Sequence, residues 1–153
     1  GVYDVGADSN RLVIDTSGRV TMPYQPSFYA YAPNNLTNTN EIFKFQTTRV
    51  NRGSHYSTST GLFTAPVDGV YQFNCHVFMT SFNPAQMSIK LNGSDIAEIK
   101  YQNITTSGTP YAPLGYSTSV YLSANDTVGF YHATGTPISA SEPFVNFSGV
   151  LLG

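Results

Sequence analysis

Apolar and polar residues alternate along short segments of this chain, which is the pattern of half-buried β-strands. The clearest segment covers residues 70–79. One of its faces carries Tyr71, Phe73, Cys75, Val77 and Met79, and the other carries Val70, Gln72, Asn74, His76 and Phe78. The first face suits a core. The second, semi-polar face suits contact with a partner subunit and equally suits a solvent-facing surface.

Short strands separated by clusters of turn residues predict a β-sandwich. The predicted strands of the main part are 28–31, 42–45, 62–64, 70–79, 87–91, 95–101, 115–122, 127–132 and 144–152. Asn92-Gly93 is the strongest two-residue hairpin signal, and residues 123–126 form a second short turn. Ile96 and Ile99 break strict alternation and predict a bulge. We expect long loops at 32–40, 81–86, 102–114 and 133–143.

Residues 1–24 follow a different pattern. Within them, residues 12–15 and 19–22 are predicted strands, and the three-residue loop between them ends in Gly18, which suits a positive φ. An isolated hairpin is marginally stable in water, so this one needs the main domain or two sister chains as a neighbour. The proline-flanked stretch 22–26 reads as an extended hinge. We therefore predict a β-hairpin stalk or linker segment over 1–26 and a head over 27–153.

Composition narrows the class of protein. Charged residues make up 10% of the chain, against about 25% in typical domains, whereas Tyr and Phe number 11 and 10. Few charges and many aromatic and neutral polar residues favour an all-β fold. The net charge of −2 argues against a nucleic-acid partner, and no apolar run is long enough for membrane insertion. The chain begins with Gly and shows no signal peptide, so we expect it to be part of a longer polypeptide.

Several motifs resemble a known family. Residues 60–73, Thr-Gly-Leu-Phe-Thr-Ala-Pro-Val-Asp-Gly-Val-Tyr-Gln-Phe, are similar to the central block of the globular head of complement C1q and its relatives. Residues 125–128 resemble the family's Gly-Asp-x-Val turn, and residues 147–152 resemble its last strand. The fold-signature residues are Phe45, Asn51, Tyr56, Phe63, Gly69, Tyr71, Phe73, Phe147 and Gly149. Cys75 departs from the family, which usually has Phe or Tyr there.

The resemblance implies an all-β, ten-strand jelly-roll sandwich of the C1q and tumour-necrosis-factor (TNF) type, assembled as a tight homotrimer with a largely apolar centre. A second resemblance concerns residues 12–23, which are similar to repeated strand segments in structural proteins and fibres of tailed bacteriophages. Animal C1q relatives usually carry a collagen-like stalk with Gly at every third position, and no such repeat is present here. This favours a virion fibre or spike over an animal secreted protein.

The predicted long loops give the candidate binding site. If the chain enters the head from the stalk, strand alternation places these loops at the far end and the short turns at the stalk end, and loops on a rigid scaffold commonly bind ligands. The candidate ligand-binding residues are Phe82, Asn83, Gln86, Gln102, Asn103, Tyr111, Ser141 and Glu142. Tyr combined with Asn and Ser suits a polysaccharide. The same composition also fits ordinary solvated loops in a Tyr-rich chain.

Chemistry beyond binding is not expected. A three-fold axis would turn one of His55, His76 or His132 into three imidazoles, but a lone His is more often structural. Some family members bind calcium through distal acids, whereas the 102–114 loop has no Asp or Glu. The single Cys75 excludes a disulfide framework. Motifs for phosphate binding, nucleophilic catalysis or zinc proteolysis are missing from the sequence. We expect no enzyme activity, no metal and no cofactor.

These inferences together predict a trimeric receptor-binding or adsorption knob at the tip of a virion fibre or spike, recognising a host-surface glycan or protein. Its partners would be itself as a homotrimer, the rest of the parent fibre or virion protein, and the host cell surface. Three weak sites on one knob would gain avidity without new contacts. One alternative is a purely structural trimerisation cap or decoration protein of the virion. Another is a secreted, extracellular C1q-domain protein that acts like a lectin.

Overall fold

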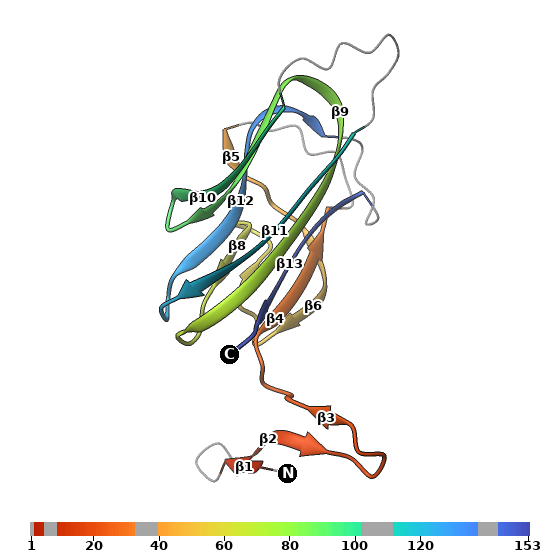
Figure 1. Ribbon diagram of the computed structural model, residues 1–153, viewed down its shortest axis with the longest axis vertical. Coiled ribbons are helices and arrows are strands. Elements are labelled where there is room, and N and C mark those ends of the chain that lie inside the picture. Colours follow the sequence, from red (N-terminus) through yellow and green to blue (C-terminus); the bar gives the residue numbers. More distant parts are fainter. Residues whose placement is uncertain (1, 5–8, 33–39, 102–111, 138–143) are drawn as a thin grey trace.

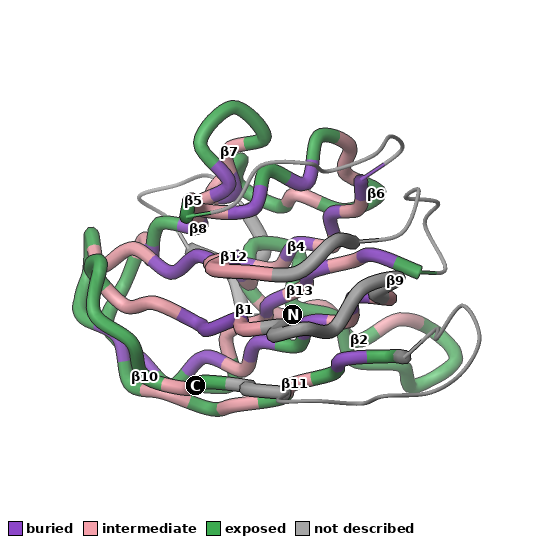
Figure 2. The backbone as a smooth tube through the Cα atoms, turned by 90° about the horizontal axis from the view of Figure 1, so that it is seen from above, coloured by how far each residue is buried: buried purple, intermediate pink, exposed green. Residues whose placement is uncertain are grey.

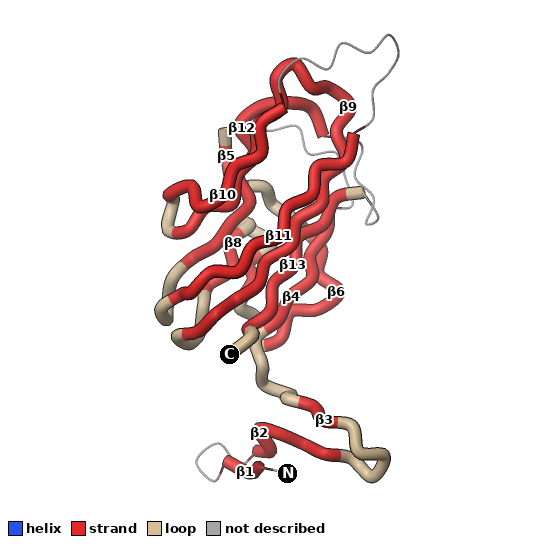
Figure 3. The backbone as a smooth tube through the Cα atoms, viewed as in Figure 1, coloured by secondary structure: helices blue, strands red, loops and turns tan. Residues whose placement is uncertain are grey.

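The computed structural model describes residues 2–4, 9–32, 40–101, 112–137 and 144–153. All regular structure in these residues is β-strand (Figure 3). The described part of the chain contains no helix long and apolar enough to cross a membrane. The strands, in chain order, are β1 (Val2–Asp4), β2 (Ser9–Ile14), β3 (Val20–Thr21), β4 (Ser27–Tyr31), β5 (Glu41–Ile42), β6 (Thr47–Arg52), β7 (Tyr56–Ser57), β8 (Leu62–Thr64), β9 (Gly69–Leu91), β10 (Ser94–Tyr101), β11 (Ala112–Leu122), β12 (Thr127–Pro137) and β13 (Val145–Leu151).

The strands form two separate sheets. Strands β1, β2 and β3 make a small antiparallel sheet that lies beyond the base of the larger one, near the C-terminus (Figure 1). The ten strands β4 to β13 make the head. Its first layer runs β6-β4-β13-β9-β11, and its second layer contains β10, the later part of β9, β12, β8, β7 and β5. The predicted ten-strand jelly roll is confirmed.

Strand β9 connects the two layers. Residues up to Met79 pair with β11 and β13, whereas residues from Ala85 onward pair with β10. Between these positions β9 arches over the end of the head opposite the small sheet (Figure 1). The predicted loop at 81–86 is therefore wrong, because hydrogen bonding to β12 continues through the bend as far as Ser81 and Met79.

Aromatic rings fill the space between the layers. Phe28 of β4 lies 4.7 Å from Tyr56 and 5.2 Å from Phe63, both in the second layer, and 5.0 Å from Phe147 of β13. Buried and more exposed residues alternate along the strands (Figure 2), as period-two patterning predicts. A Cβ on Gly149 would lie 2.6 Å from the Phe28 ring and 2.8 Å from another ring, so this position needs glycine.

Some of the predicted turns and strand bounds agree with the structure and others do not. Gly18 has φ +79°, Asn92 and Gly93 have φ +49° and +84°, and the β10 register shifts between Asp95 and Ala97. The predicted turns at Gly18 and at Asn92-Gly93 and the predicted bulge are therefore confirmed. Strands β6 and β7 were not predicted. The sequence of β6, Thr-Thr-Arg-Val-Asn-Arg, has no apolar alternation because this edge strand buries neither face fully. Predicted strand 42–45 is shorter, since β5 ends at Ile42, and β12 extends into the predicted loop as far as Pro137.

Candidate functional site

The structure describes few of the predicted ligand-binding residues. Gln102, Asn103, Tyr111, Ser141 and Glu142 lie outside the described residues. Positions 82 and 83 belong to the bend of β9, which lies at the far end of the head as predicted, and their side chains are outside the described part (Figure 1).

Gln86 follows the same bend. It is half-buried and donates a hydrogen bond to the Glu98 carboxylate. The distal site as a whole stays a prediction.

A second candidate surface, which we call the sheet face, is the outward face of strands β4, β13, β9 and β11 in the first layer. The edge strand β6, whose Arg52 lies opposite Ser27, is not part of it. Strand pairing aligns its residues in rows: His76 lies opposite Asn146 and Gly115, and Asn74 lies opposite Ser148 and Ser117. The outward-facing positions of β4, β13, β9 and β11 are Ser27, Tyr29, Tyr31, Val70, Gln72, Asn74, His76, Phe78, Pro113, Gly115, Ser117, Ser119, Tyr121, Asn146, Ser148 and Val150. None of these is Asp, Glu, Lys or Arg.

The outward face of the second layer differs in charge. Lys90 of β9 lies 2.9 Å from the Asp95 carboxylate and 4.4 Å from the centre of the Tyr131 ring. Glu98 lies beside them on β10. Buried charges carry a large desolvation penalty, whereas neutral polar groups cost little when they find hydrogen-bond partners. The sheet face is therefore the better suited of the two to contact another protomer.

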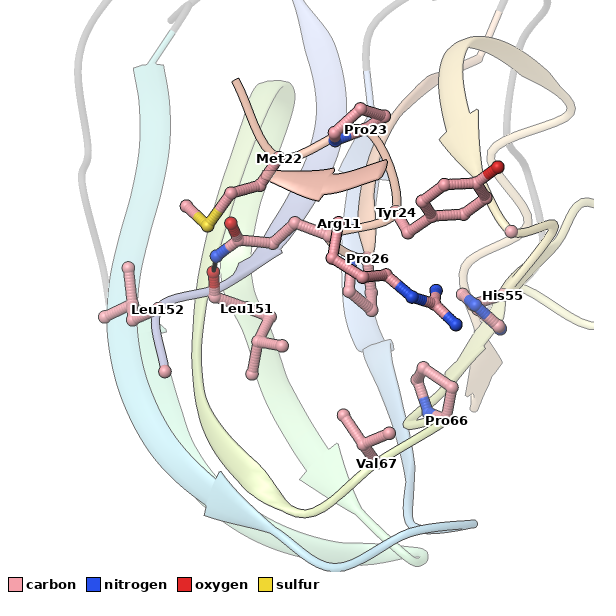
Figure 4. Close-up of a pocket in the computed structure, with 13 residues that line it drawn as sticks. Arg11, Met22, Pro23, Tyr24, Pro26, His55, Pro66, Val67, Leu151 and Leu152 are labelled. Atoms are coloured by element: carbon pink, nitrogen blue, oxygen red, sulfur yellow. Dashed lines mark hydrogen bonds between the residues drawn. The ribbon is translucent and has the colours of Figure 1, made fainter. Parts of the chain in front are cut away.

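A third feature is a pocket of about 580 Å³ at the base of the head. Residues 22–26 of the linker form one side, and the turns at Gly53 and His55 and at Pro66 and Val67, together with the C-terminal residues 151–153, form the rest (Figure 4). Its lining is mainly apolar. Arg11 reaches it from β2, with the guanidinium 4.9 Å from the centre of the Tyr24 ring.

Hydrogen bonds hold the linker against the head. The Arg52 guanidinium donates to the Pro23 carbonyl at 3.0 Å, and the Leu151 backbone N–H donates to the Pro26 carbonyl at 3.0 Å. The Gln25 amide also donates to the Leu151 carbonyl. The pocket wall made by residues 22–26 is thus held against the head at Pro23 and at Pro26.

The titratable groups near these surfaces have physical reasons for their pKa values. Partial burial lowers the pKa of His55, which lines the base pocket, because burial disfavours the charged imidazolium. Full burial raises the pKa of the Cys75 thiol well above its usual value. Burial also raises the pKa of Tyr71, whose hydroxyl donates to the Val67 carbonyl at 2.9 Å. These shifts indicate structural roles rather than reactive groups.

The three histidines are separate. His55 lies at the base, His76 on the sheet face, and His132 is fully buried with its ring 5.5 Å from that of Phe43. Among the described residues, no group of three or more His, Cys, Asp or Glu side chains could hold a metal ion.

The fold-signature residues lie in the core and its turns. Phe45, Tyr56, Phe63, Tyr71, Phe73 and Phe147 are all buried. Asn51 is the polar member. Its amide nitrogen donates to the Tyr56 carbonyl at 2.8 Å and its amide oxygen accepts from the Tyr56 N–H at 3.1 Å. Gly69 opens β9, where a Cβ would meet Leu151 at 2.7 Å.

Sequence reasoning missed the base pocket. Its walls come from residues 11, 22–26, 53, 55, 66–67 and 151–153, which no local pattern connects. The available signal was two large apolar residues that lie outside every predicted strand, Tyr24 and Val67. Sequence reasoning also left open whether the outward side of β9 faces solvent or another subunit. The sequence of one strand does not show which strands lie beside it, nor that their outward-facing residues are uncharged.

Solved structures that share this architecture include those of three proteins from different animals. The globular domain of zebrafish complement 1qA protein has a TM-score of 0.69 at 16% identity, covering 84% of this chain and 98% of that chain. The Eiger TNF of S. frugiperda has a TM-score of 0.62 at 10% identity, covering 84% and 93%. Murine APRIL has a TM-score of 0.61 at 13% identity, covering 84% and 99%. At these identities the likeness shows a shared fold.

Comparison by sequence identifies the family. No curated protein matches the chain. The model of the C1q domain family matches residues 27–152, which is most of the sequence and the whole of the ten-stranded head. The two lines of comparison agree with each other and with the buried signature residues. The chain therefore belongs to the C1q domain family.

Proposed function

We propose that the chain is a trimeric recognition head of a virion fibre or spike, which binds a host-surface glycan or protein through the end opposite the hairpin. The observation that carries the proposal is the uncharged sheet face. C1q and TNF domains form homotrimers and often serve in recognition. A surface of Tyr, Val, Ser, Asn and Gln can be buried against another protomer without leaving a charged side chain buried and unpaired.

Residues 1–26 are proposed to be the stalk segment of this head. In the single chain Ile14 and Val20 of the hairpin are 57% and 58% exposed, which is costly for large apolar side chains. Sister chains would cover them. A stalk built from β-hairpins, with no Gly at every third residue, supports a fibre or spike rather than a collagen-type stalk.

The trimeric arrangement explains how weak sites would serve adsorption. Three distal ends point the same way when three heads associate around an axis through their stalk. Each engaged site holds the others at high effective concentration, so the affinity of a particle exceeds that of one site. This needs no catalytic step, in keeping with C1q and TNF domains being recognition and signalling domains.

The test is binding of labelled protein, verified as a trimer by light scattering, to a panel of bacterial cells and their isolated surface polysaccharides. Saturable binding to one strain, lost when Phe82 and Tyr111 are both changed to Ala, is expected. Ile96→Ala serves as the control, since Ile96 is 37% exposed on β10 in the second layer. A monomer would refute the assembly. A trimer that binds no host of its parent particle would favour the structural cap.

A further inference from the structure

The stalk end of the protein exposes an unusual amount of apolar surface. On the hairpin these side chains are Ile14 and Val20, and around the base pocket they are Met22, Val67 and Leu152. Contiguous apolar patches on a monomer mark surfaces that meet another molecule. Two such patches at one end of the same chain raise the question of whether each covers the other.

The hairpin does not fill the pocket of its own chain. The small sheet of β1, β2 and β3 shares no strand pairing with the ten-stranded sheet in the part that the structure describes. Ile14 and Val20 remain more than half exposed although Arg11, on the same strand as Ile14, reaches the pocket. Within the described part of the chain, the apolar side chains of the hairpin are therefore left without the pocket as a partner, and the pocket is left without them.

The pocket is continuous with the proposed trimer interface. The Leu152 N–H donates to the Val70 carbonyl at 2.8 Å, and Val70 lies directly opposite Tyr121 of β11 at the lower row of the sheet face. Val70 and Tyr121 are both exposed. An apolar path thus runs from the pocket rim onto the sheet face, so protomers that meet through this face bring their hairpins close to each other's pockets.

The hairpin has the right chemistry for this pocket. Asp15 at its turn accepts a 2.6 Å hydrogen bond from the Arg19 guanidinium, so the turn carries a neutral ion pair rather than a lone charge. The Asp15 carboxylate also accepts from the Ser17 and Arg19 backbone N–H groups, which makes the turn rigid. A volume of about 580 Å³ accommodates two branched aliphatic side chains with room for their backbone.

We propose that the base pocket of each head is a socket for the stalk hairpin of a neighbouring protomer, which inserts Ile14 and Val20 between residues 22–26, Val67 and Leu152. This inference rests on the proposed trimer. It adds a specific role, because the socket would lock the rotation of each head relative to the stalk by contacts between different chains. A force applied at the distal end would then be transmitted to the fibre through the three contacts between a hairpin and the base pocket of a neighbouring protomer.

Cysteine pairing between chains tests the socket. Tagged chains carrying Val20→Cys are co-expressed with untagged chains carrying Val67→Cys, oxidised mildly, and separated on a non-reducing gel. A covalent tagged–untagged pair is expected, since a disulfide forms only between residues whose Cα atoms lie within about 7 Å. Val20→Cys with Ile96→Cys is the control and is expected to give none. The native Cys75 is buried and does not compete.

The outcomes separate the socket from the trimer. A trimer by light scattering without the Val20–Val67 pair overturns the socket and leaves the trimer in place. Links only between two Val20→Cys chains mean that hairpins meet on the axis, which also overturns it. A monomer removes the proposed trimer itself. Native mass spectrometry showing a small molecule bound in the trimer, lost on Val67→Asp, would assign the pocket to a ligand and overturn the hairpin as its occupant.

Proteolysis gives an independent measurement on the full chain. Trypsin cleaves after Arg19, which is exposed in the single chain. Insertion of the hairpin should protect this bond, and Val67→Asp should release it and speed cleavage about tenfold, the factor that matches burial of one valine side chain. Ile96→Asp should leave the rate unchanged. Equal cleavage rates in the two variants, with both still trimeric, would contradict the socket.

Discussion

Replacing Phe28 with Ala should remove much of the stability of the head. Phe28 is 3% exposed, and its ring lies within about 5 Å of Tyr56, Phe63 and Phe147, so one side chain joins the two layers. Phe→Ala changes in cores cost about 3–5 kcal/mol, because transfer free energy is lost and a cavity remains. Close ring pairs add roughly 0.5–1.5 kcal/mol each. We expect a loss near the upper end of the first range.

Urea unfolding followed by tyrosine fluorescence would measure this loss. With a slope of roughly 2 kcal/mol per molar urea, a loss of about 5 kcal/mol lowers the midpoint by about 2.5 M. Parent and variant must be compared at equal protomer concentration, since subunit association contributes to stability. Ile96→Ala should change the free energy of unfolding by no more than about 0.5 kcal/mol. A Phe28→Ala loss below about 1 kcal/mol with an unchanged slope would refute the packing argument.

Four further outcomes are expected. Gly149→Ala should lower stability by about 1–3 kcal/mol in the same urea assay, since its Cβ overlaps aromatic rings, and an unchanged midpoint would contradict this. Ser117→Asp should convert the trimer to monomers in light scattering, whereas Ser94→Asp on the second layer should not; a trimer in both would exclude the sheet face as the interface. Cys75 should react with a thiol reagent only on unfolding, and fast native labelling would show that it is accessible. Because the pKa of His55 is lowered in the folded state, the unfolded chain binds more protons, so the free energy of unfolding should fall as the pH drops below about 6.5. His55→Gln should flatten this pH dependence, whereas identical pH profiles of parent and variant would assign the dependence to other groups.

The predictions that held rest on short-range chemistry. Gly18 and the Asn92-Gly93 pair adopt positive φ, which few other residues tolerate, so their turns follow from residue type. Alternation along residues 70–79 placed Tyr71 and Phe73 in the core because the side chains of a strand alternate by geometry. The predictions that failed concern how far strands extend along the chain. Whether 81–86 is loop or strand depends on β12 lying beside it, which local residue type does not encode.

The sequence by itself determined the all-β class and the family, because strand periodicity, turn residues and the residue 60–73 motif are properties of adjacent positions. Only the tertiary structure decided which sheet face is free of charge and that residues 22–26, Val67 and Leu152 surround one pocket. Those features arise from strands distant in sequence that hydrogen-bond side by side. Their pairing is set by how the aromatic core packs as a whole, and no single segment carries it.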